Sequence, residues 1–574
     1  MFKRANKITS LLVAAAAIVS IVPASAADVK KVDSQDGVVY NAVAYKGAAL
    51  VDGEVNDNDG AYYLKDGKYT EIADVDSGSD YALYGSKYVN VDEGDYFVDL
   101  TTGKSTDDSM DEDDMDDAAS ALRKKIKDAD RYGDNANIAT LKIIPGNKFG
   151  ETWYSTNGYT IAAGSANNGT TPSIYTDKNG AYIDADYNLG KIKVETTGAS
   201  AVTGTVTVEN TVDTEDLKSG NTKFATVDAK INATNNIALG QDKDNIYRYA
   251  EITIKLTPES GVTLPTNVLV NGKSFATAGN VVTLPVIQKI AKTQDSDDID
   301  DAMYSKTVTN YVFSNDGGDL TDGNAVKYLA LAKKAGTEAR VIGGKLALYN
   351  VTDNLTGKDN VAVQATTLKS KNGYYYTDAE DQTTLEAEVN GDLDKTAFDT
   401  DVDGNIYVIE DGYVKKFDGT DDWTKLYKVD GSMNAISAYD KDNMVTWSQE
   451  DEVYSVIGGK DADETPVTTT PAVTAGWAKA TDGTWTFVKA DGTKATGWYQ
   501  DGATWYYLGA TGTMATGWQN VGGTWYYLAG SGAMVTGWFT DATGTWYYTN
   551  ASGAMLANTV VDGYKLGASG AWVK

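Results

Sequence analysis

Hydrophobic and polar residues alternate over short runs through most of the chain, and this period of two residues predicts β-strands with one buried face. Residues 61–72 (AYYLKDGKYTEI) predict a strand, an Asp-Gly turn and a second strand, and residues 86–100 repeat that pattern. Alternating runs across 135–305 predict a β-sandwich-like domain. The chain is therefore predicted to be mainly β and multi-domain.

Two segments depart from the alternation and predict helices. Residues 118–134 (AASALRKKIKDADRYGD) follow an acidic run at 107–117, and acidic residues favour a helix N-terminus. Residues 325–336 (AVKYLALAKKAG) predict a second, short helix. The acidic run itself is interpreted as a solvated loop rather than a cation site. Hairpins near the N-terminus and across 338–459 look similar to β-propeller blades.

From residue 476 onward the pattern repeats about every twenty residues. Each unit holds a Gly-Trp pair, then a second tryptophan seven or eight residues later, then in most units a Gly-x-Met. One hairpin of this length cannot bury a core, but stacked hairpins can. The region predicts a C-terminal β-hairpin solenoid. The repeated residues are Trp477, Trp498, Trp518 and Trp538, then Trp485, Trp505, Trp525 and Trp546, then Met514, Met534 and Met555.

The repeated aromatic residues predict a binding surface. In TWYYL the tryptophan and the second tyrosine share one face of the strand, since side chains alternate. Rings from neighbouring hairpins could form a box that attracts a quaternary ammonium, at roughly 0.5–2 kcal/mol per ring, and methionine would add an apolar wall. Two alternatives stay open: the rings form a core, or they stack on a glycan.

These motifs closely resemble the choline-binding, or cell-wall-binding, repeats of Gram-positive surface proteins, over about the last hundred residues. The resemblance implies ligand sites between consecutive hairpins. Each would use both tryptophans of one repeat, the second tyrosine of the next and the intervening methionine. It implies one site of Trp498, Trp505, Met514 and Tyr527, and another of Trp518, Trp525, Met534 and Tyr548.

The first and last repeats depart from the pattern. In the first, Lys494 stands where methionine belongs, and a cationic side chain would repel a cationic ligand. In the last, Leu566 is interpreted as replacing the second tyrosine, and residues 558–574 as a terminal cap. The weaker candidate sites are Trp477 with Trp485 and Tyr507, and Trp538 with Trp546 and Met555.

The amino-acid composition excludes several partners and catalytic mechanisms. The net charge is -31 over 574 residues, which argues against nucleic acid as a partner. The repeats are neutral, with five lysines and five aspartates from residue 476 to the end. The chain has no cysteine and no histidine, which excludes Ser-His-Asp and Cys-His catalysis and imidazole zinc sites. Only carboxylate, hydroxyl or lysine chemistry remains.

Residues 399–410 (DTDVDGNIYVIE) match the spacing of a calcium-binding loop. The match would make calcium the cofactor. The following GNIYVIEDG reads as a strand rather than a helix, so the alternative is an ordinary hairpin turn. The candidate ligands are the side chains of Asp399, Asp401, Asp403 and Glu410, with the backbone carbonyl of Asn405.

Residues 1–26 predict a signal peptide, with a basic start, a short apolar run and Ala-Ser-Ala before cleavage. No later stretch is apolar enough to predict a membrane span. The predicted order is signal peptide 1–26, hairpin-rich segment 27–106, acidic loop and helix 107–134, sandwich-like domain 135–305, hairpin or propeller-like domain 306–460, Thr/Pro linker 461–475 and cell-wall-binding repeats 476–574.

The leading hypothesis is a secreted, non-enzymatic protein of a Gram-positive cell surface. Its repeats would hold choline of wall teichoic acid or a wall glycan, and its acidic ectodomain would act in surface-layer assembly, with self-association, or in adhesion. Bulk composition resembles that of surface-layer proteins. The alternatives are a wall hydrolase that works as a carboxylate glycosidase and a glycan-binding adhesin.

Overall fold

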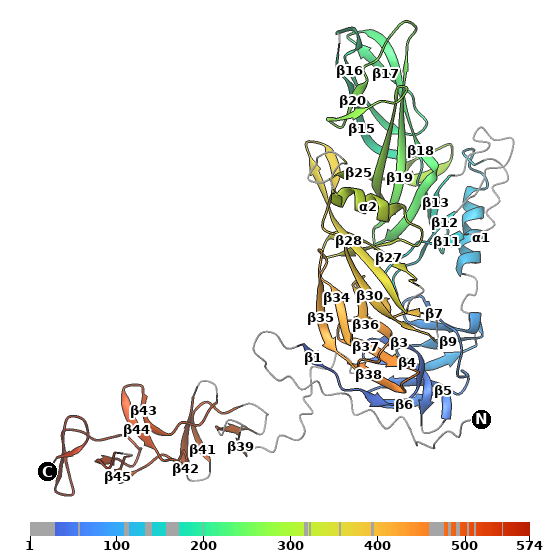
Figure 1. The fold of residues 1–574 in the computed structure, drawn as a ribbon. Helices are drawn as coiled ribbons and strands as arrows, with labels where there is room; N and C mark the ends of the chain where they lie inside the picture. Colours follow the sequence, from blue (N-terminus) through green and yellow to red (C-terminus); the bar gives the residue numbers. More distant parts are fainter. Residues whose placement is uncertain are drawn as a thin grey trace. The chain divides into compact units, whose positions relative to one another are not determined.

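The computed structural model is almost entirely β, with two α-helices in the part it describes (Figure 1). The prediction of a mainly β chain is confirmed. Two compact units, residues 1–462 and 463–574, divide the chain, and each is described by itself. The described residues are 29–55, 58–107, 114–132, 141–156, 172–198, 200–314, 320, 323–354, 357–391, 395–458, 476–479, 484–489, 494–501, 504–509, 512–541 and 543–573. The predicted signal peptide, most of the acidic run and the Thr/Pro linker lie outside them.

Two antiparallel four-stranded sheets form the N-terminal part of the first unit. The first sheet holds β3 (Val39–Tyr45), β4 (Ala48–Val55), β5 (Asn58–Lys65) and β6 (Lys68–Glu71). The second holds β7 (Tyr81–Tyr84), β8 (Tyr88–Val91), β9 (Tyr96–Asp99) and β10 (Lys104–Thr106). Leu50 and Tyr63 from the first pack with Val89 and Val98 from the second, so the sheets lie face to face.

Two further sheets each take a strand from the N-terminus. β32 (Phe398–Thr400), β33 (Ile406–Glu410), β34 (Tyr413–Phe417) and β35 (Trp423–Lys428) are joined by β1 (Lys30–Lys31), parallel to β35. β36 (Ala435–Asp440), β37 (Asn443–Ser448) and β38 (Val453–Ile457) are joined by β2 (Gln35–Asp36), antiparallel to β38. These pairings tie residues near 30 to residues near 450, a long-range contact that no local pattern predicts.

In the sequence a sandwich comes between these N-terminal and C-terminal sheets, and in Figure 1 it lies at the opposite end of the unit from them. One face is β15 (Asn188–Thr196), β16 (Gly204–Asn210), β20 (Asn267–Val270) and β21 (Lys273–Ala276). The other belongs to a larger sheet, whose strands β17 (Glu215–Ser219), β18 (Thr222–Gln241), β19 (Asn245–Pro258) and β22 (Val281–Ala291) face it. Ile192 and Val208 from the first face pack with Ile252 and Val282 from the second.

The larger sheet continues beyond the sandwich. It adds β25 (Val308–Ser314), β26 (Glu338–Ile342), β27 (Lys345–Thr352), β28 (Lys358–Lys371) and β29 (Tyr374–Ala379), with β30 (Thr383–Asn390) and β31 (Lys395–Thr396) at the side. A separate six-stranded sheet holds β11 (Leu141–Ile143), β12 (Trp153–Thr156), β13 (Ile174–Asp177), β14 (Tyr182–Asp184), β23 (Gln294–Ile299) and β24 (Ala302–Ser305).

The two helices cover sheets in the first unit. α1 (Asp114–Ile126) begins before and ends earlier than the predicted 118–134, because the chain turns after Ile126 and buries Ala129 and Tyr132 against the same core. α2 (Gly323–Lys333) lies close to the predicted 325–336 and buries Tyr328. Neither helix in the described residues is long and apolar enough to cross a bilayer.

The second unit is a row of hairpins. They are β39 (Gly476–Lys479) with β40 (Trp485–Val488), β41 (Gly497–Asp501) with β42 (Thr504–Leu508), β43 (Gly517–Val521) with β44 (Thr524–Leu528), and β45 (Gly537–Thr540) with β46 (Trp546–Thr549). β47 (Val560–Val561), β48 (Tyr564–Leu566) and β49 (Trp572–Val573) follow. Gly497, Gly517 and Gly537 have φ of 71°, 71° and 83°, a region open mainly to glycine, which explains the Gly-Trp pair.

Candidate functional site

Each of the first four hairpins pairs the tryptophan of its Gly-Trp motif with a ring directly across the strands. Trp498 is opposite Tyr507 and Trp518 is opposite Tyr527, with ring centroids 5.2 and 5.1 Å apart. The contacts are edge-to-face, a favourable geometry for aromatic pairs. The same pair recurs at 5.3 Å for Trp477 with Phe487 and at 5.2 Å for Trp538 with Tyr548.

The second tryptophan of each hairpin is the exposed one. Trp498 and Trp505 are nearly perpendicular at 82° with centroids 6.5 Å apart, and Trp518 and Trp525 are at 84° and 6.3 Å. Two rings at a right angle form two walls of a corner. The second tryptophans retain 38 to 45% of their surface exposed, which leaves one wall of each corner open to a ligand; they are Trp485, Trp505, Trp525 and Trp546.

A third ring comes from the following hairpin. Tyr526 lies 4.7 Å from Trp498, and Tyr547 lies 4.8 Å from Trp518, between ring centroids. Both are the first tyrosine of a Trp-Tyr-Tyr motif. Each corner therefore combines two tryptophans of one hairpin with a tyrosine of the next, which is the architecture expected from the sequence.

The identity of that tyrosine differs from the prediction. The family resemblance places Tyr527 at the Trp498 corner, but in the structure it pairs across its own hairpin with Trp518. Neighbouring residues of a strand point to opposite faces, so only Tyr526 can face backwards. Tyr548 and Tyr507 likewise lie within their own hairpins. Alternation puts the two tyrosines on opposite faces, but which face meets the preceding hairpin depends on the stacking.

The methionines join one hairpin to the one before it. The backbone N–H of Met514 donates to the carbonyl of Trp485, and that of Met534 donates to Trp505, both over 2.7 Å. Met555 donates to Trp525 over 2.8 Å. The sulfur of Met514 fills the space beside Gly532, which a side chain there would occupy. The backbone of each methionine is thus joined to the preceding hairpin while its side chain lies against the following repeat, and its place in a ligand site stays a prediction.

Both end repeats keep part of the pattern. At the start, the Lys494 stem lies against Gly512 as methionine does elsewhere, and Tyr506 lies 4.5 Å from Trp477. At the end, Leu566 is fully buried, so it takes the place of the leucine in TWYYL rather than of a tyrosine. Tyr564 supplies the closing ring, 5.5 Å from Trp538.

Carboxylates accompany three of the four Gly-Trp indoles. Asp501 accepts a hydrogen bond from Nε1 of Trp477, and Asp562 accepts one from Nε1 of Trp538, both over 3.0 Å. The pKa of Asp541 lies below its ordinary value, chiefly because Thr543 donates to it, with a smaller contribution from the Trp518 indole. The sequence pattern did not predict a role for these aspartates, because the repeats have no net charge and aromatic rings can hold a cation without a carboxylate.

The Trp498 corner differs from the others. Asp501 is paired with Thr504 across its hairpin, and the corresponding partner of Thr524 is Val521. Valine cannot accept a hydrogen bond from an indole or attract a cation. The repeats therefore present chemically unequal sites.

Adding a carboxylate at residue 521 and removing the one at residue 501 should change the cation affinity of the two corners in opposite directions. Val521→Asp is expected to raise choline affinity of the Trp498 corner about 2- to 5-fold, and Asp501→Asn to lower that of the Trp477 corner similarly, since exposed charge pairs contribute little. Titration of the full chain with choline, followed by tryptophan fluorescence at low and at high salt, measures both. Equal affinities in all variants would contradict the assignment, and salt should shrink the differences.

The predicted calcium ligands do not converge. Asp401 is buried and accepts from the backbone N–H groups of Asp403 and Asn405, from the Asn405 amide and from the Tyr407 hydroxyl, at 2.8–2.9 Å. Its oxygens thus hold a turn between β32 and β33. Asp399 contacts Lys148, and Glu410 contacts Lys415. Within the described residues, no cluster of three or more acidic side chains could hold a metal ion. The segment has the geometry of the alternative, a hairpin turn.

Asp401 is instead expected to stabilise the fold. Asp401→Ala should lower the free energy of unfolding by about 2–3 kcal/mol, because buried donors lose a charged acceptor. The loss should be the same with calcium or with a chelator, as measured by thermal unfolding. Asp403→Ala, which changes a neighbouring carboxylate, serves as the control. A loss seen only in calcium would restore the calcium loop.

The repeats match known families. Residues 515–559 match the family described as a choline-binding repeat, and residues 496–514 match a cell wall binding repeat. No curated protein matches the sequence.

Several solved structures are similar over part of the chain. The choline-binding domain of Spr1274 from Streptococcus pneumoniae is 46% identical, over 14% of this chain and 96% of that one, with a TM-score of 0.14. Choline-binding protein F of the same species, solved with a peptidoglycan analogue, is 23% identical over 41% and 77%, with a TM-score of 0.13. A pneumococcal cell wall endolysin of phage Cp-1, complexed with choline, is 32% identical over 21% and 42%, with a TM-score of 0.12.

Proposed function

We propose, from the premise that residues 496–559 carry choline-binding-type repeats, that this protein is held non-covalently on a Gram-positive cell wall by quaternary ammonium groups of a wall polymer such as teichoic acid. The observation that carries the proposal is the recurrence of one three-ring corner along the row of hairpins. Two perpendicular tryptophans and one tyrosine from the next hairpin surround a space of the kind that binds trimethylammonium.

The exposed tryptophans support a binding role over a purely structural one. A side chain needed only for packing would be buried, as the leucines Leu508 and Leu528 of these hairpins are, at 1% and 0% exposure. Trp525 keeps 45% of its surface exposed although it and Trp518 are the largest side chains in that hairpin. Exposed aromatic rings at a fixed period are typical of ligand sites.

The first unit would then be displayed at the surface. Surface-layer assembly or adhesion is the role proposed for it. The excess acidic charge of the chain lies outside the neutral repeats, which favours a soluble displayed body. No role in catalysis is proposed for any residue.

The proposal is tested by passing the full mature chain over a choline-substituted resin and eluting with free choline. Retention with specific elution is the expected result. A folded protein that flows through but binds purified walls, and loses that binding in Trp505→Ala with Trp525→Ala, would show that the corners hold a glycan instead. A folded protein that does neither would overturn the proposed anchoring role.

A further inference from the structure

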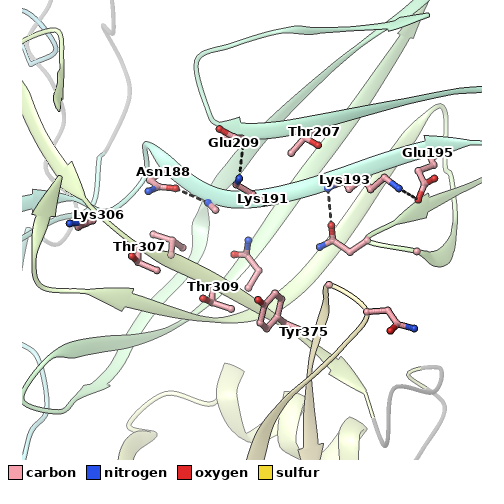
Figure 2. Close-up of a pocket in the computed structure, with 17 residues that line it drawn as sticks. Asn188, Lys191, Lys193, Glu195, Thr207, Glu209, Lys306, Thr307, Thr309 and Tyr375 are labelled. Atoms are coloured by element: carbon pink, nitrogen blue, oxygen red, sulfur yellow. Dashed lines mark hydrogen bonds and ion pairs between the residues drawn. The ribbon is translucent and has the colours of Figure 1, made fainter. Parts of the chain in front are cut away.

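An open groove of about 710 Å³ lies in the first unit, between the outer face of the sandwich and strand β25 of the larger sheet (Figure 2). β15 and β16 form one side, and β25 and the turn between β28 and β29 form the other. On β15, Lys191, Lys193 and Glu195 line the groove, and they alternate with Ile192 and Val194, which are buried in the core. The groove is thus the polar face of a strand whose other face is fixed by packing.

The two sides of the groove are joined by short contacts. Gly190 has a φ of 64° and lies so close to the carbonyl of Val308 that a Cβ there would be 2.3 Å from the oxygen. The Asn188 amide donates to the carbonyl of Ser305 over 2.8 Å. The Asn310 amide donates to the carbonyl of Leu189 over 2.6 Å. β15 and β25 are therefore held at one separation.

A buried polar chain continues behind this wall. Asn310 accepts from Gln288 over 2.7 Å, and Gln288 accepts from Nε of Arg248 over 2.5 Å. Arg248 is fully buried and also donates to Asp186 and to the carbonyl of Ala185. Every link has a partner, and satisfied buried networks rigidify the elements that they join. The groove is therefore preformed rather than created by a mobile loop.

The lining is rich in groups that bind hydroxyls. Thr207, Thr307 and Thr309 offer hydroxyl groups, and Asn271 and Asn372 offer amides. Three lysines face two glutamates here, although the whole chain is strongly acidic. Lys193 pairs with Glu195 at 3.0 Å and Lys191 with Glu209 at 3.8 Å. Three of these side chains are at least half exposed and Glu195 is 23% exposed, so the lysines can exchange these partners for a ligand.

One aromatic ring lies in this polar surrounding. Tyr375 follows the turn formed by Asn372 and Gly373, which have φ of 54° and 83°. Its ring is 40% exposed, and the ring of Tyr311 contacts it edge-to-face at 5.7 Å and 83°. The contact fixes the orientation of Tyr375 while leaving a ring surface in the groove.

We propose that this groove binds a glycan chain, with the Tyr375 ring stacking on a sugar and the threonine, asparagine, lysine and glutamate side chains bonding its hydroxyls. Sugars present an apolar ring face and a periphery of hydroxyls that both donate and accept. The groove offers the complement of both: one oriented ring, and donors and acceptors in alternation. An apolar ligand would find little surface here, and a polyanion would meet Glu195 and Glu209.

This site is separate from the repeats and does not depend on their ligand. The groove would give the displayed unit its own contact with a carbohydrate, which is the adhesive role in a specific chemical form. Because choline can occupy the repeats during the assay, a failure of glycan binding leaves wall anchoring untouched, and a failure of choline binding leaves the groove untouched.

The test is calorimetric titration of the full chain, in saturating choline, with two soluble probes: an N-acetylglucosamine tetrasaccharide and a glucose tetrasaccharide. At least one probe is expected to bind. Tyr375→Ala should lower the affinity for that probe at least tenfold, while Tyr375→Phe should keep the affinity within about threefold of wild type. Lys193→Ala should weaken binding, whereas Lys255→Ala, an exposed lysine outside the groove, should not.

Two results would overturn the proposal. One is the absence of heat with both probes for the folded wild-type chain. The other is a probe that binds Tyr375→Ala as tightly as wild type, because the sugar would then lie elsewhere. An unchanged unfolding temperature of Tyr375→Ala shows that a loss of binding is not a loss of folding.

Discussion

The double variant Trp505→Ala with Trp525→Ala is expected to lose retention on a choline resin. Each substitution removes one perpendicular wall from a corner between hairpins. A desolvated cation–π contact contributes about 1–2 kcal/mol, so each site should weaken about 5- to 30-fold, and two weakened sites should release the chain from a multivalent surface. Elution position at increasing choline concentration measures the effect.

The matched control keeps the rings. Trp505→Phe with Trp525→Phe should be retained more weakly than wild type but more strongly than the alanine variant, because phenylalanine is the weaker cation–π partner. Both tryptophans are substantially exposed, so the hairpins should still form, as circular dichroism can show. Unchanged retention of a folded alanine variant would mean that these rings do not contact the resin's choline.

The second large effect is expected from Arg248→Met in the sandwich. The substitution removes the Arg248 donor from the carboxylate of Asp186, the side-chain oxygen of Gln288 and the carbonyl of Ala185, and Asp186 keeps its bond from the Ser173 backbone N–H. Removing one partner of a buried charged network typically costs 3–5 kcal/mol, and the partial exposure of Asp186 places the expected loss near about 3 kcal/mol.

Calorimetry can separate the two units. The transition that does not shift with added choline belongs to residues 1–462, since a ligand raises only the unfolding temperature of the unit that binds it. That transition should fall in Arg248→Met and stay in place in Lys230→Met, which changes an exposed cation on β18 of the same sheet. Equal transitions in both variants would show that the buried network contributes little.

Local sequence patterns were enough to predict the fold of the repeats. The period, the Gly-Trp pair and the alternation in TWYYL are all properties of a twenty-residue segment, and they predicted hairpins that stack with two tryptophans each. The tyrosine was misassigned because its partner depends on how adjacent hairpins stack. That stacking puts Tyr526, and not Tyr527, against Trp498.

For the calcium motif, in contrast, the local pattern did not predict what the side chains contact. Its spacing is that of ligands, but spacing does not say which donors surround a carboxylate. In the folded chain Lys148, which is remote in sequence, contacts Asp399, and Tyr407 donates to Asp401. The Asp399 carboxylate is thus occupied by a lysine from outside the motif, and the Asp401 carboxylate by donors of its own turn.

The sequence by itself determined the β class, the hairpin repeats and their aromatic chemistry, because period and side-chain type act over a few residues. Tertiary structure alone decided which rings meet between hairpins, how β1 and β2 complete sheets built from residues near 430 and 455, and that Lys193, Thr309 and Tyr375 line one groove. Those outcomes depend on contacts between residues of different hairpins or of strands remote in sequence, and a pattern read over one strand carries no information about them.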